Sequence, residues 1–179
     1  MTTSGGRQSA AVTASPVSTS LLTWHFCAFA ELSVQALERI YTARQQVFLI
    51  EQNCVYLDAD GRDSTSYHLA AWSSAHSLPL AYARLVAPGV AYAEPSMGRV
   101  ITAAAARGQG LGRELVKRLI DHAQTVYPCQ GLRISAQSHL EGFYGEFGFA
   151  VQGERYLEDG IAHTEMLLRA AQLKTLKPT

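Results

Sequence analysis

A glycine-rich segment constrains the fold of this chain more than any other feature. Arg107-Gly108-Gln109-Gly110-Leu111-Gly112 follows an apolar run from Ser96 to Thr102 and leads into a helical pattern in which Leu115 and Leu119 recur. A glycine turn from a strand into a helix leaves several backbone N–H groups exposed, and the helix dipole favours an anion there. Glycine suits such a turn because a β-carbon would keep a phosphate away from the backbone. The glycines alone fit an ordinary helix-capping turn equally well.

Two familiar phosphate-binding patterns do not fit this segment. A P-loop requires Lys and then Ser or Thr directly after its last glycine, whereas Gly112 is followed by Arg113 and Glu114. A dinucleotide-binding fingerprint that starts at Gly108 would require glycine at position 113. Both nucleotide-binding classes are therefore excluded.

The rest of the sequence alternates between strand and helix patterns. Strands are predicted over 22–28, 67–72, 80–86, 96–102 and 132–136, and a hairpin joins 149–157 to 163–168 across Glu158-Asp159-Gly160. Ser33 is expected to cap a helix that extends to Phe48, and a second helix follows the glycine segment, with Leu111, Leu115 and Leu119 in one row. Ser138 and Glu141 have the spacing of a capping box, which predicts a short helix that ends near Gly148. This order predicts one mixed α/β domain.

Length and charge limit the classes of function. The 179 residues fit one domain, which we place at 21–170, with a flexible leader over 1–20 and a tail over 171–179. The 15 basic and 15 acidic side chains balance, which argues against a nucleic-acid partner and a polybasic membrane contact. No apolar run is long enough to span a membrane. His25 interrupts the apolar stretch near the start, so we interpret it as a strand, not a signal peptide, and expect a cytoplasmic protein.

Neither the cysteines nor the aspartates have the pattern of a metal site. The three cysteines lie far apart, at Cys27, Cys54 and Cys129. Without a C-x-x-C pair they are expected to be buried, reduced thiols. The segment with Asp58, Asp60 and Asp63 lacks the last carboxylate of an EF-hand, because Leu69 stands there. We expect no metal, and a solvated loop whose acidic residues attract a cationic amine.

Two motifs together resemble one superfamily. Arg107-x-x-Gly110-x-Gly112 resembles the pyrophosphate-binding signature of the GNAT superfamily of N-acetyltransferases, Arg/Gln-x-x-Gly-x-Gly/Ala. The segment from His139 to Phe149 is similar to the short helix of that family, which ends in Phe-Tyr-x-x-Phe-Gly-Phe. The resemblance covers about residues 22–169. Segments 47–61 and 158–163 are more narrowly similar to its ElaA-like branch.

The resemblance implies both a fold and a reaction. The fold is a mixed, mostly antiparallel sheet of six to seven strands that is flanked by helices and splayed between strands four and five. The reaction moves an acetyl group from acetyl-CoA directly to a primary amine, without an acyl-enzyme intermediate, so no cysteine is needed as a nucleophile. The acceptor is a small amine or a peptide N-terminus. An exposed edge of the hairpin often pairs between subunits in such folds, so a homodimer is an alternative to a monomer.

The resemblance also implies which residues hold the cofactor. The pyrophosphate is expected to bind the backbone of the turn, which consists of Arg107, Gly108, Gln109, Gly110, Leu111 and Gly112. The pantetheine arm pairs with the backbone of Val100, Ile101 and Thr102, where one N–H stabilises the oxyanion. Gln137 stands in place of a family asparagine and is expected to reach cofactor or substrate. Tyr144 stands at the position of the general acid beside the departing sulfur. Its ordinary pKa of about 10 exceeds that of a thiol, about 8.5, so hydrogen bonding carries much of the effect.

The general base is where this sequence departs from the family. Ser96 occupies the place of the glutamate that many members carry on strand four. The alternatives for the base are Glu94, His139, His163, Glu51 or a water molecule. A non-catalytic acyl-CoA-binding or sensor domain is the alternative function, because such a domain would keep the phosphate motif without a base.

Overall fold

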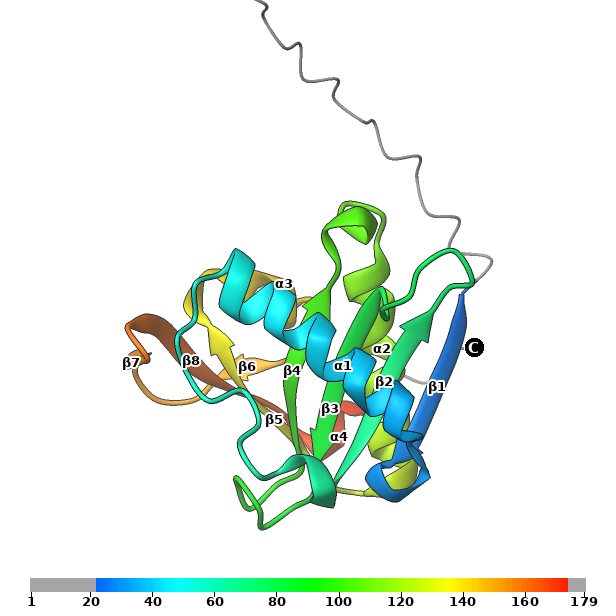
Figure 1. The fold of residues 1–179 in the computed structure, drawn as a ribbon. Coiled ribbons are helices and arrows are strands. Elements are labelled where there is room, and N and C mark those ends of the chain that lie inside the picture. The colour runs from blue at the N-terminus through cyan, green and yellow to red at the C-terminus, as the bar shows by residue number, and fades with distance from the viewer. Residues whose placement is uncertain (1–21, 174–179) are drawn as a thin grey trace, which may run out of the picture.

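The computed structural model describes residues 22–173, in which an eight-stranded sheet carries helices on both faces (Figure 1). In chain order the elements are β1 (Thr23–Ala28), α1 (Val34–Gln45), β2 (Ser66–Trp72), β3 (Ala81–Val86), β4 (Ser96–Thr102), α2 (Leu111–Val126), β5 (Leu132–Gln137), α3 (Glu141–Gly145), β6 (Ala150–Val151), β7 (Tyr156–Glu158), β8 (Ile161–Leu168) and α4 (Ala170–Leu173). The predicted leader lies outside the described residues, as does the end of the predicted tail from residue 174.

The sheet is splayed between β4 and β5. Strands β1 to β4 form an antiparallel meander, and β5 pairs antiparallel with β8. The parallel contact of β4 with β5 is a single pair, Ser96 opposite Arg133, with the Arg133 N–H donating to the Pro95 carbonyl oxygen at 3.0 Å. Beyond this pair the two strands diverge. The predicted fold class, a mixed and mostly antiparallel sheet with this splay, is confirmed.

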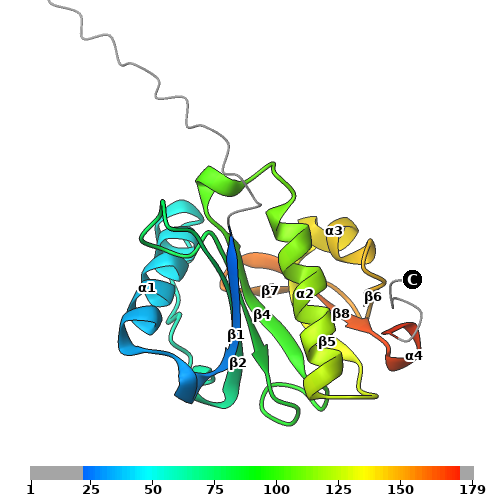
Figure 2. The same ribbon diagram turned by 90° about the vertical axis from the view of Figure 1, so that its right-hand side faces the viewer.

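The helices cover opposite faces of the sheet, with α1 on one side and α2 on the other (Figure 2). Because side chains alternate along a strand, β3 contributes side chains to the core on both faces of the sheet. Tyr82 packs in a core cluster with Ile40 of α1, whereas Ala83 and Leu85 pack with the apolar face of α2. Buried residues on both faces explain why β3 is an unbroken buried run.

The predicted long strand over 149–157 is two short strands. Gly153, at φ +77°, turns the chain between β6 and β7, and both strands pair with β8. A left-handed residue does not continue an extended strand, so the sheet has eight strands where six to seven were expected. The hairpin itself is confirmed, since Asp159 and Gly160 both have positive φ between β7 and β8, as a tight hairpin turn requires.

One predicted helix cap is confirmed and another is wrong. Ser33 caps α1, because its Oγ accepts a hydrogen bond from the Ala36 N–H at 3.1 Å. Helix α1 ends at Gln45 and continues as a π-helical turn over Gln46–Glu51. Ser138 and Glu141 do not form a capping box. Both side chains bind the hydroxyl of Thr164 on β8 instead, at 2.8 and 2.6 Å, and α3 begins at Glu141 after a 3₁₀ turn.

Candidate active site

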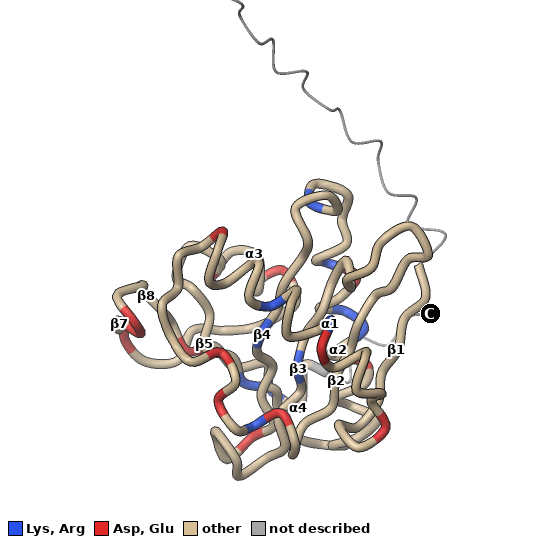
Figure 3. The backbone as a smooth tube through the Cα atoms, viewed as in Figure 1, with Lys and Arg blue, Asp and Glu red and all other residues tan. Residues whose placement is uncertain are grey.

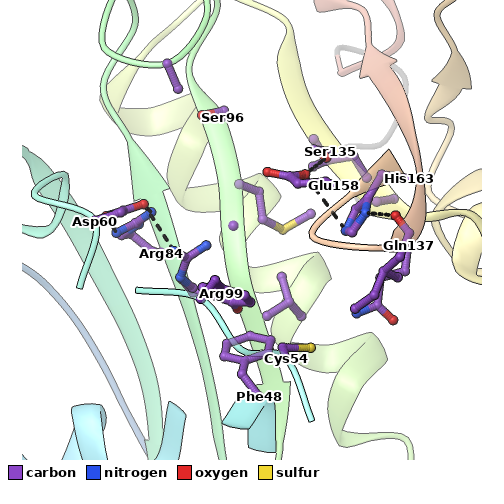
Figure 4. Close-up of a pocket in the computed structure, with 18 of the residues that line it drawn as sticks. Phe48, Cys54, Asp60, Arg84, Ser96, Arg99, Ser135, Gln137, Glu158 and His163 are labelled. Carbon is purple, nitrogen blue, oxygen red and sulfur yellow. Dashed lines mark hydrogen bonds and ion pairs between the residues drawn. The ribbon is translucent and has the colours of Figure 1, made fainter. Parts of the chain in front are cut away.

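A cleft of about 380 Å³ lies where β4 and β5 diverge (Figure 4). Strand β4 lines it from Ser96 to Val100, and β5 lines it from Ile134 to Gln137. The hairpin of β7 and β8 adds Glu158 and His163, and α3 adds Tyr144. The pairing of Ser96 with Arg133 marks the closed end of the cleft, and the carboxyl ends of β4 and β5 mark its open end. The splay therefore creates a slot into which an extended molecule fits beside β4.

A β-bulge interrupts β4 beside this cleft. Tyr82 pairs with Ile101 and Arg84 pairs with Gly98, so one residue of β3 stands opposite two residues of β4. Within the bulge Arg99 has φ +53°, in the left-handed region. A bulge leaves backbone groups without a partner in the ladder. Together with the splay, it makes the middle of β4 a place where backbone N–H and C=O groups are available to a ligand.

The glycine turn lies at the open end of the cleft. Gly108 and Gly110 adopt φ of +75° and +79°, and a β-carbon built on either would have no other heavy atom within 4 Å. Gly110 is the residue before α2, a helix of 16 residues whose first N–H groups have no carbonyl partner within the helix. Arg107 donates from Nε to the Thr102 carbonyl oxygen at 3.0 Å. The turn thus presents bare backbone and a helix N-terminus next to the end of β4, as an anion site requires.

Tyr144 is a buried side chain on the wall of the cleft. It is 6% exposed, and its ring packs edge-on against Phe143 and Phe149. Burial raises the pKa of its hydroxyl to about 12. No residue between 22 and 173 forms a hydrogen bond with this hydroxyl. Tyr144 is therefore a protonated donor that remains available to a ligand in the cleft.

Two further predicted residues line the cleft: Gln137, near its open end, and Cys54. The Gln137 amide donates to Oε1 of Gln52 at 3.3 Å, which connects β5 with the segment after α1. Burial, with a contribution from Asp159, raises the pKa of the Cys54 thiol, which disfavours the reactive thiolate. All three cysteines are free, but the expectation that all are buried is wrong. Cys129 is exposed, because it lies in the turn after α2.

Three of the four candidate bases lie away from the cleft. Arg133 donates two hydrogen bonds to Glu94, each of 3.0 Å, and they lower the pKa of that carboxyl group. Glu51 pairs with Arg107 beside the glycine turn. His139 is exposed on the turn before α3 and does not line the cleft. None of these three side chains lines the cleft.

His163 is the predicted candidate that the fold brings to the cleft. Its Nδ1 lies 2.9 Å from the Ile161 carbonyl oxygen, and its Nε2 lies 4.0 Å from Oε2 of Glu158. A carbonyl oxygen accepts only, so Nδ1 carries the hydrogen and Nε2 faces Glu158. Ser96 also lines the cleft, at its closed end, where β4 pairs with Arg133 of β5.

The segment of Asp58, Asp60 and Asp63 forms a buried ion network, so the prediction of a solvated loop is wrong. Figure 3 shows acidic positions along the segment before β2 and basic positions on β3 and β4. The three aspartates pair with three arginines: Arg44 on α1, Arg84 on β3 and Arg99 on β4. The three pairs cancel in charge, so the aspartates are not free to attract an amine.

The shortest contacts of the network centre on Arg84 and Asp63. Arg84 donates two hydrogen bonds of 2.7 Å to the two oxygens of Asp60 and one of 3.0 Å to Asp63. Arg44 donates to Asp63 at 2.8 Å. One signal in the sequence could have revealed the network: Arg84 interrupts an apolar strand, and a buried charge requires a partner.

The network predicts a loss of stability in acid. Burial alone would raise the pKa values of Asp60 and Asp63, but the hydrogen bonds and charges of Arg84 and Arg44 lower both. A carboxyl group with a lowered pKa in the folded state stabilises the fold above its unfolded pKa of about 3.9, and this contribution is lost as the pH falls through the folded value. We expect the thermal unfolding midpoint of the wild type to exceed that of Asp60→Asn by a nearly constant margin from about pH 7 to 5, and this margin to shrink below about pH 4. Circular dichroism melts of the wild type and Asp60→Asn provide the check. Their midpoints should converge as the pH falls, and parallel curves would contradict the assignment.

Comparisons with known proteins agree on one family. A model of the GNAT acetyltransferase domain matches residues 64–170. The UPF0039 protein sll0451 of Synechocystis is 45% identical over 148 residues, which cover 83% of this chain and 96% of that protein. ElaA of Escherichia coli is 34% identical over 154 residues, which cover 85% of this chain and 99% of ElaA.

Solved structures give the same result. The crystal structure of an acyl-CoA N-acyltransferase from Pseudomonas aeruginosa superposes with a TM-score of 0.78 at 38% identity, covering 82% of this chain and 99% of that one. The crystal structure of E. coli ElaA superposes with a TM-score of 0.77, covering 83% of this chain and 99% of that one. Sequence and fold similarity therefore extend over nearly the whole length of these relatives.

Proposed function

The chain belongs to the GNAT acetyltransferase family, in its ElaA-like branch, and from this membership we propose that it is an N-acetyltransferase that moves an acetyl group from acetyl-CoA to a primary amine. The family supports acyl transfer from an acyl-CoA. Acetyl as the acyl group and a primary amine as the acceptor are our proposal. The observation that carries it is the splay of β4 from β5 with the glycine turn at its open end.

The cleft suggests how acetyl-CoA binds. The pyrophosphate would lie on the turn Arg107–Gly112, where the space beside Gly108 and Gly110 is open. The pantetheine arm would run along β4 and pair with the backbone of Val100 to Thr102. The thioester would then lie at the bulge, where an unpaired N–H can stabilise the oxyanion of the tetrahedral intermediate. Gln137, on the opposite wall, would contact cofactor or acceptor.

In this proposal Tyr144 donates a hydrogen bond to the sulfur as the carbon–sulfur bond breaks. Its pKa of about 12 lies well above that of a thiol, about 8.5, so complete proton transfer to the thiolate would be uphill by about 5 kcal/mol. Burial thus favours a hydrogen-bond donor over a full proton donor. A buried donor that is already in place would stabilise the charge that forms on sulfur.

Thiol release tests the proposed reaction. The protein is incubated with acetyl-CoA and, in turn, with ethylamine, 2-phenylethylamine, spermidine and trialanine, while free CoA is measured and the acetylated amine is identified by mass spectrometry. Amine-dependent release of CoA is the expected result. Binding of acetyl-CoA without release by any amine would favour the acyl-CoA-binding or sensor domain, which the serine at position 96 keeps open.

Removing only the hydroxyl of Tyr144 tests its role. Tyr144→Phe keeps the ring and its edge-on packing, so the Kd of acetyl-CoA should hardly change. We expect kcat to fall about 10- to 10³-fold, because the lost donor acts only as the thiolate forms. Phe143→Tyr is the control for changes on α3. Phe143 donates no hydrogen bond in the proposed reaction, so this variant should keep kcat within about threefold of the wild type. A wild-type kcat in Tyr144→Phe, with chemistry rate-limiting, would make Tyr144 a core residue only.

The proposal includes a cytoplasmic location. The three free thiols fit a compartment that keeps cysteines reduced. No helix within residues 22–173 is long and apolar enough to cross a membrane.

A further inference from the structure

Glu158 differs from the other acidic residues on the wall of the cleft. Three carboxylates line the cleft: Asp60, Glu158 and Asp159. Asp60 is neutralised by Arg84 and Arg99. Within the described part of the chain, neither Glu158 nor Asp159 pairs with a lysine or an arginine. Glu158 is the one of these two that the sheet holds in place.

Two hydroxyl groups fix the position of this carboxylate. Ser135 on β5 donates to Oε2 of Glu158 at 3.1 Å (Figure 4). The Ser135 hydroxyl also lies 2.6 Å from that of Tyr156. His163 approaches the same oxygen, Oε2, at 4.0 Å. Among residues 22–173, no group forms a hydrogen bond with the second oxygen, Oε1. Glu158 is thus anchored through one oxygen, and the other is free to accept.

Glu158 lies in the part of the cleft where the acceptor amine would bind. Ser135 lies two residues along β5 from Arg133, which pairs with Ser96 at the closed end, whereas Gln137 lies nearer the open end. If the pantetheine arm enters along Val100 to Thr102, its thioester stops at the bulge. The anchored carboxylate then stands beyond the thioester, on the side from which a nucleophile must attack.

We propose that Glu158 binds the ammonium group of the acceptor and removes its proton. It would replace the glutamate that many members of the family carry at the position of Ser96. This inference rests on the proposed function and deepens it: the acceptor is a primary amine that is cationic at neutral pH. The carboxylate pairs with the ammonium through Oε1 and takes one proton, which then passes to solvent. The neutral nitrogen attacks the thioester carbon, and the carbon–sulfur bond breaks. The nitrogen loses its second proton as the thiolate gains one, so the reaction yields an amide, free CoA and one proton.

Exposure favours Glu158 over its neighbour His163 as the group that meets the amine. The Glu158 side chain is 54% exposed, whereas that of His163 is 13% exposed. The imidazole also directs Nε2 at Glu158 and uses Nδ1 on a backbone carbonyl. The 4.0 Å from Nε2 to Oε2 is too long for a hydrogen bond, so His163 does not hold the carboxylate, and the carboxylate attracts a cation directly.

The test compares Glu158→Gln with the matched variant Asp159→Asn. Glutamine keeps the size of the side chain and an oxygen that can accept from Ser135, but it takes no proton. Asp159→Asn removes the adjacent charge from the same hairpin. The three proteins are assayed for CoA release with ethylamine and with 2,2-difluoroethylamine, whose fluorine atoms lower the pKa of the amine. The Kd of acetyl-CoA and the unfolding midpoint are measured for each protein.

We expect Glu158→Gln to lower kcat/KM for ethylamine about 100-fold at an unchanged Kd of acetyl-CoA, and Asp159→Asn to stay within about threefold of the wild type. The defect of Glu158→Gln should shrink to about tenfold or less with 2,2-difluoroethylamine at about pH 8.5, where most of this amine is already deprotonated and ethylamine is still cationic. Equal rates of wild type and Glu158→Gln would overturn the role of Glu158 and leave the proposed function intact. An equal defect with both amines would also overturn it. A wild type that acetylates no amine would overturn the proposed function itself.

Discussion

Gly110→Val is expected to lower the affinity for acetyl-CoA by about 100-fold or more, while the protein remains folded. The space beside Gly110 is open in the described fold, and a β-carbon there has no atom within 4 Å beyond its chain neighbours. It would instead occupy the space that the proposed function gives to the pyrophosphate. The backbone cost is about 1–2 kcal/mol, because valine at a φ of +79° is strained, and this is a fraction of the roughly 5–15 kcal/mol of a typical domain. Calorimetric titration with acetyl-CoA gives the affinity, and circular dichroism reports the fold.

Gly153→Val is the matched control for this change. Gly153 also has a positive φ, +77°, and open space around its β-carbon position, but it lies in the loop between β6 and β7 and not in the turn that precedes α2. Valine therefore imposes the same kind of strain there without reaching the proposed cofactor. Gly153→Val should bind acetyl-CoA as the wild type does. If the two variants bind acetyl-CoA equally well, the glycine turn is a structural helix cap and not the phosphate site.

The elements that could be predicted from the sequence are those set by local patterns. The strand Ser96–Thr102 agrees with the structure to the residue, and the helix expected at the glycine turn is α2, because an apolar run, a glycine turn and a helical row follow one another directly. The Ser33 cap was predictable for the same reason. The splay between β4 and β5 came from the family resemblance, since no local pattern reports that two strands diverge.

The features that could not be predicted depend on distant partners. The capping box failed because Thr164, on a strand far along the chain, binds Ser138 and Glu141 more directly than the helix backbone does. Glu158 was interpreted as a turn residue, because its meeting with Ser135 depends on how β7 and β8 lie against β5. Spacing along the sequence carries no information about such contacts.

The ion network connects the fold to the cleft through Arg99. This residue forms part of the β4 bulge in a left-handed conformation, and its guanidinium pairs with Asp58 and Asp60. A non-glycine residue is held at positive φ only where its surroundings fix it. The contacts of Arg99 with the two aspartates supply that constraint. The geometry of β4 at the proposed thioester site thus depends on charges contributed by the segment between α1 and β2.

Asp63→Ala is expected to destabilise the fold by about 3–5 kcal/mol, because it removes one partner from a buried ion network. Asp63 is 4% exposed, and it accepts from Arg44 at 2.8 Å, from Arg84 at 3.0 Å and from the Tyr41 hydroxyl at 3.1 Å. Alanine leaves two buried guanidinium groups short of a negative charge and the tyrosine without its acceptor. Urea unfolding followed by circular dichroism gives the free energy of unfolding. For a chain of this size the unfolding midpoint should fall by about 6–20 °C.

Glu146→Ala tests whether the destabilisation expected for Asp63→Ala comes from burial or from the loss of an ion pair as such. Glu146 accepts three hydrogen bonds from Arg113, between 2.8 and 3.0 Å, but the two side chains are 52% and 59% exposed. An exposed pair of this kind contributes about 0–1 kcal/mol, so Glu146→Ala should unfold within about 1 kcal/mol of the wild type. The contrast follows from solvation, since water replaces the lost partner of Arg113 but does not reach Arg44 and Arg84. If Asp63→Ala and Glu146→Ala cost the same, the aspartate segment is solvated after all, and the bulge at Arg99 must be held by other contacts.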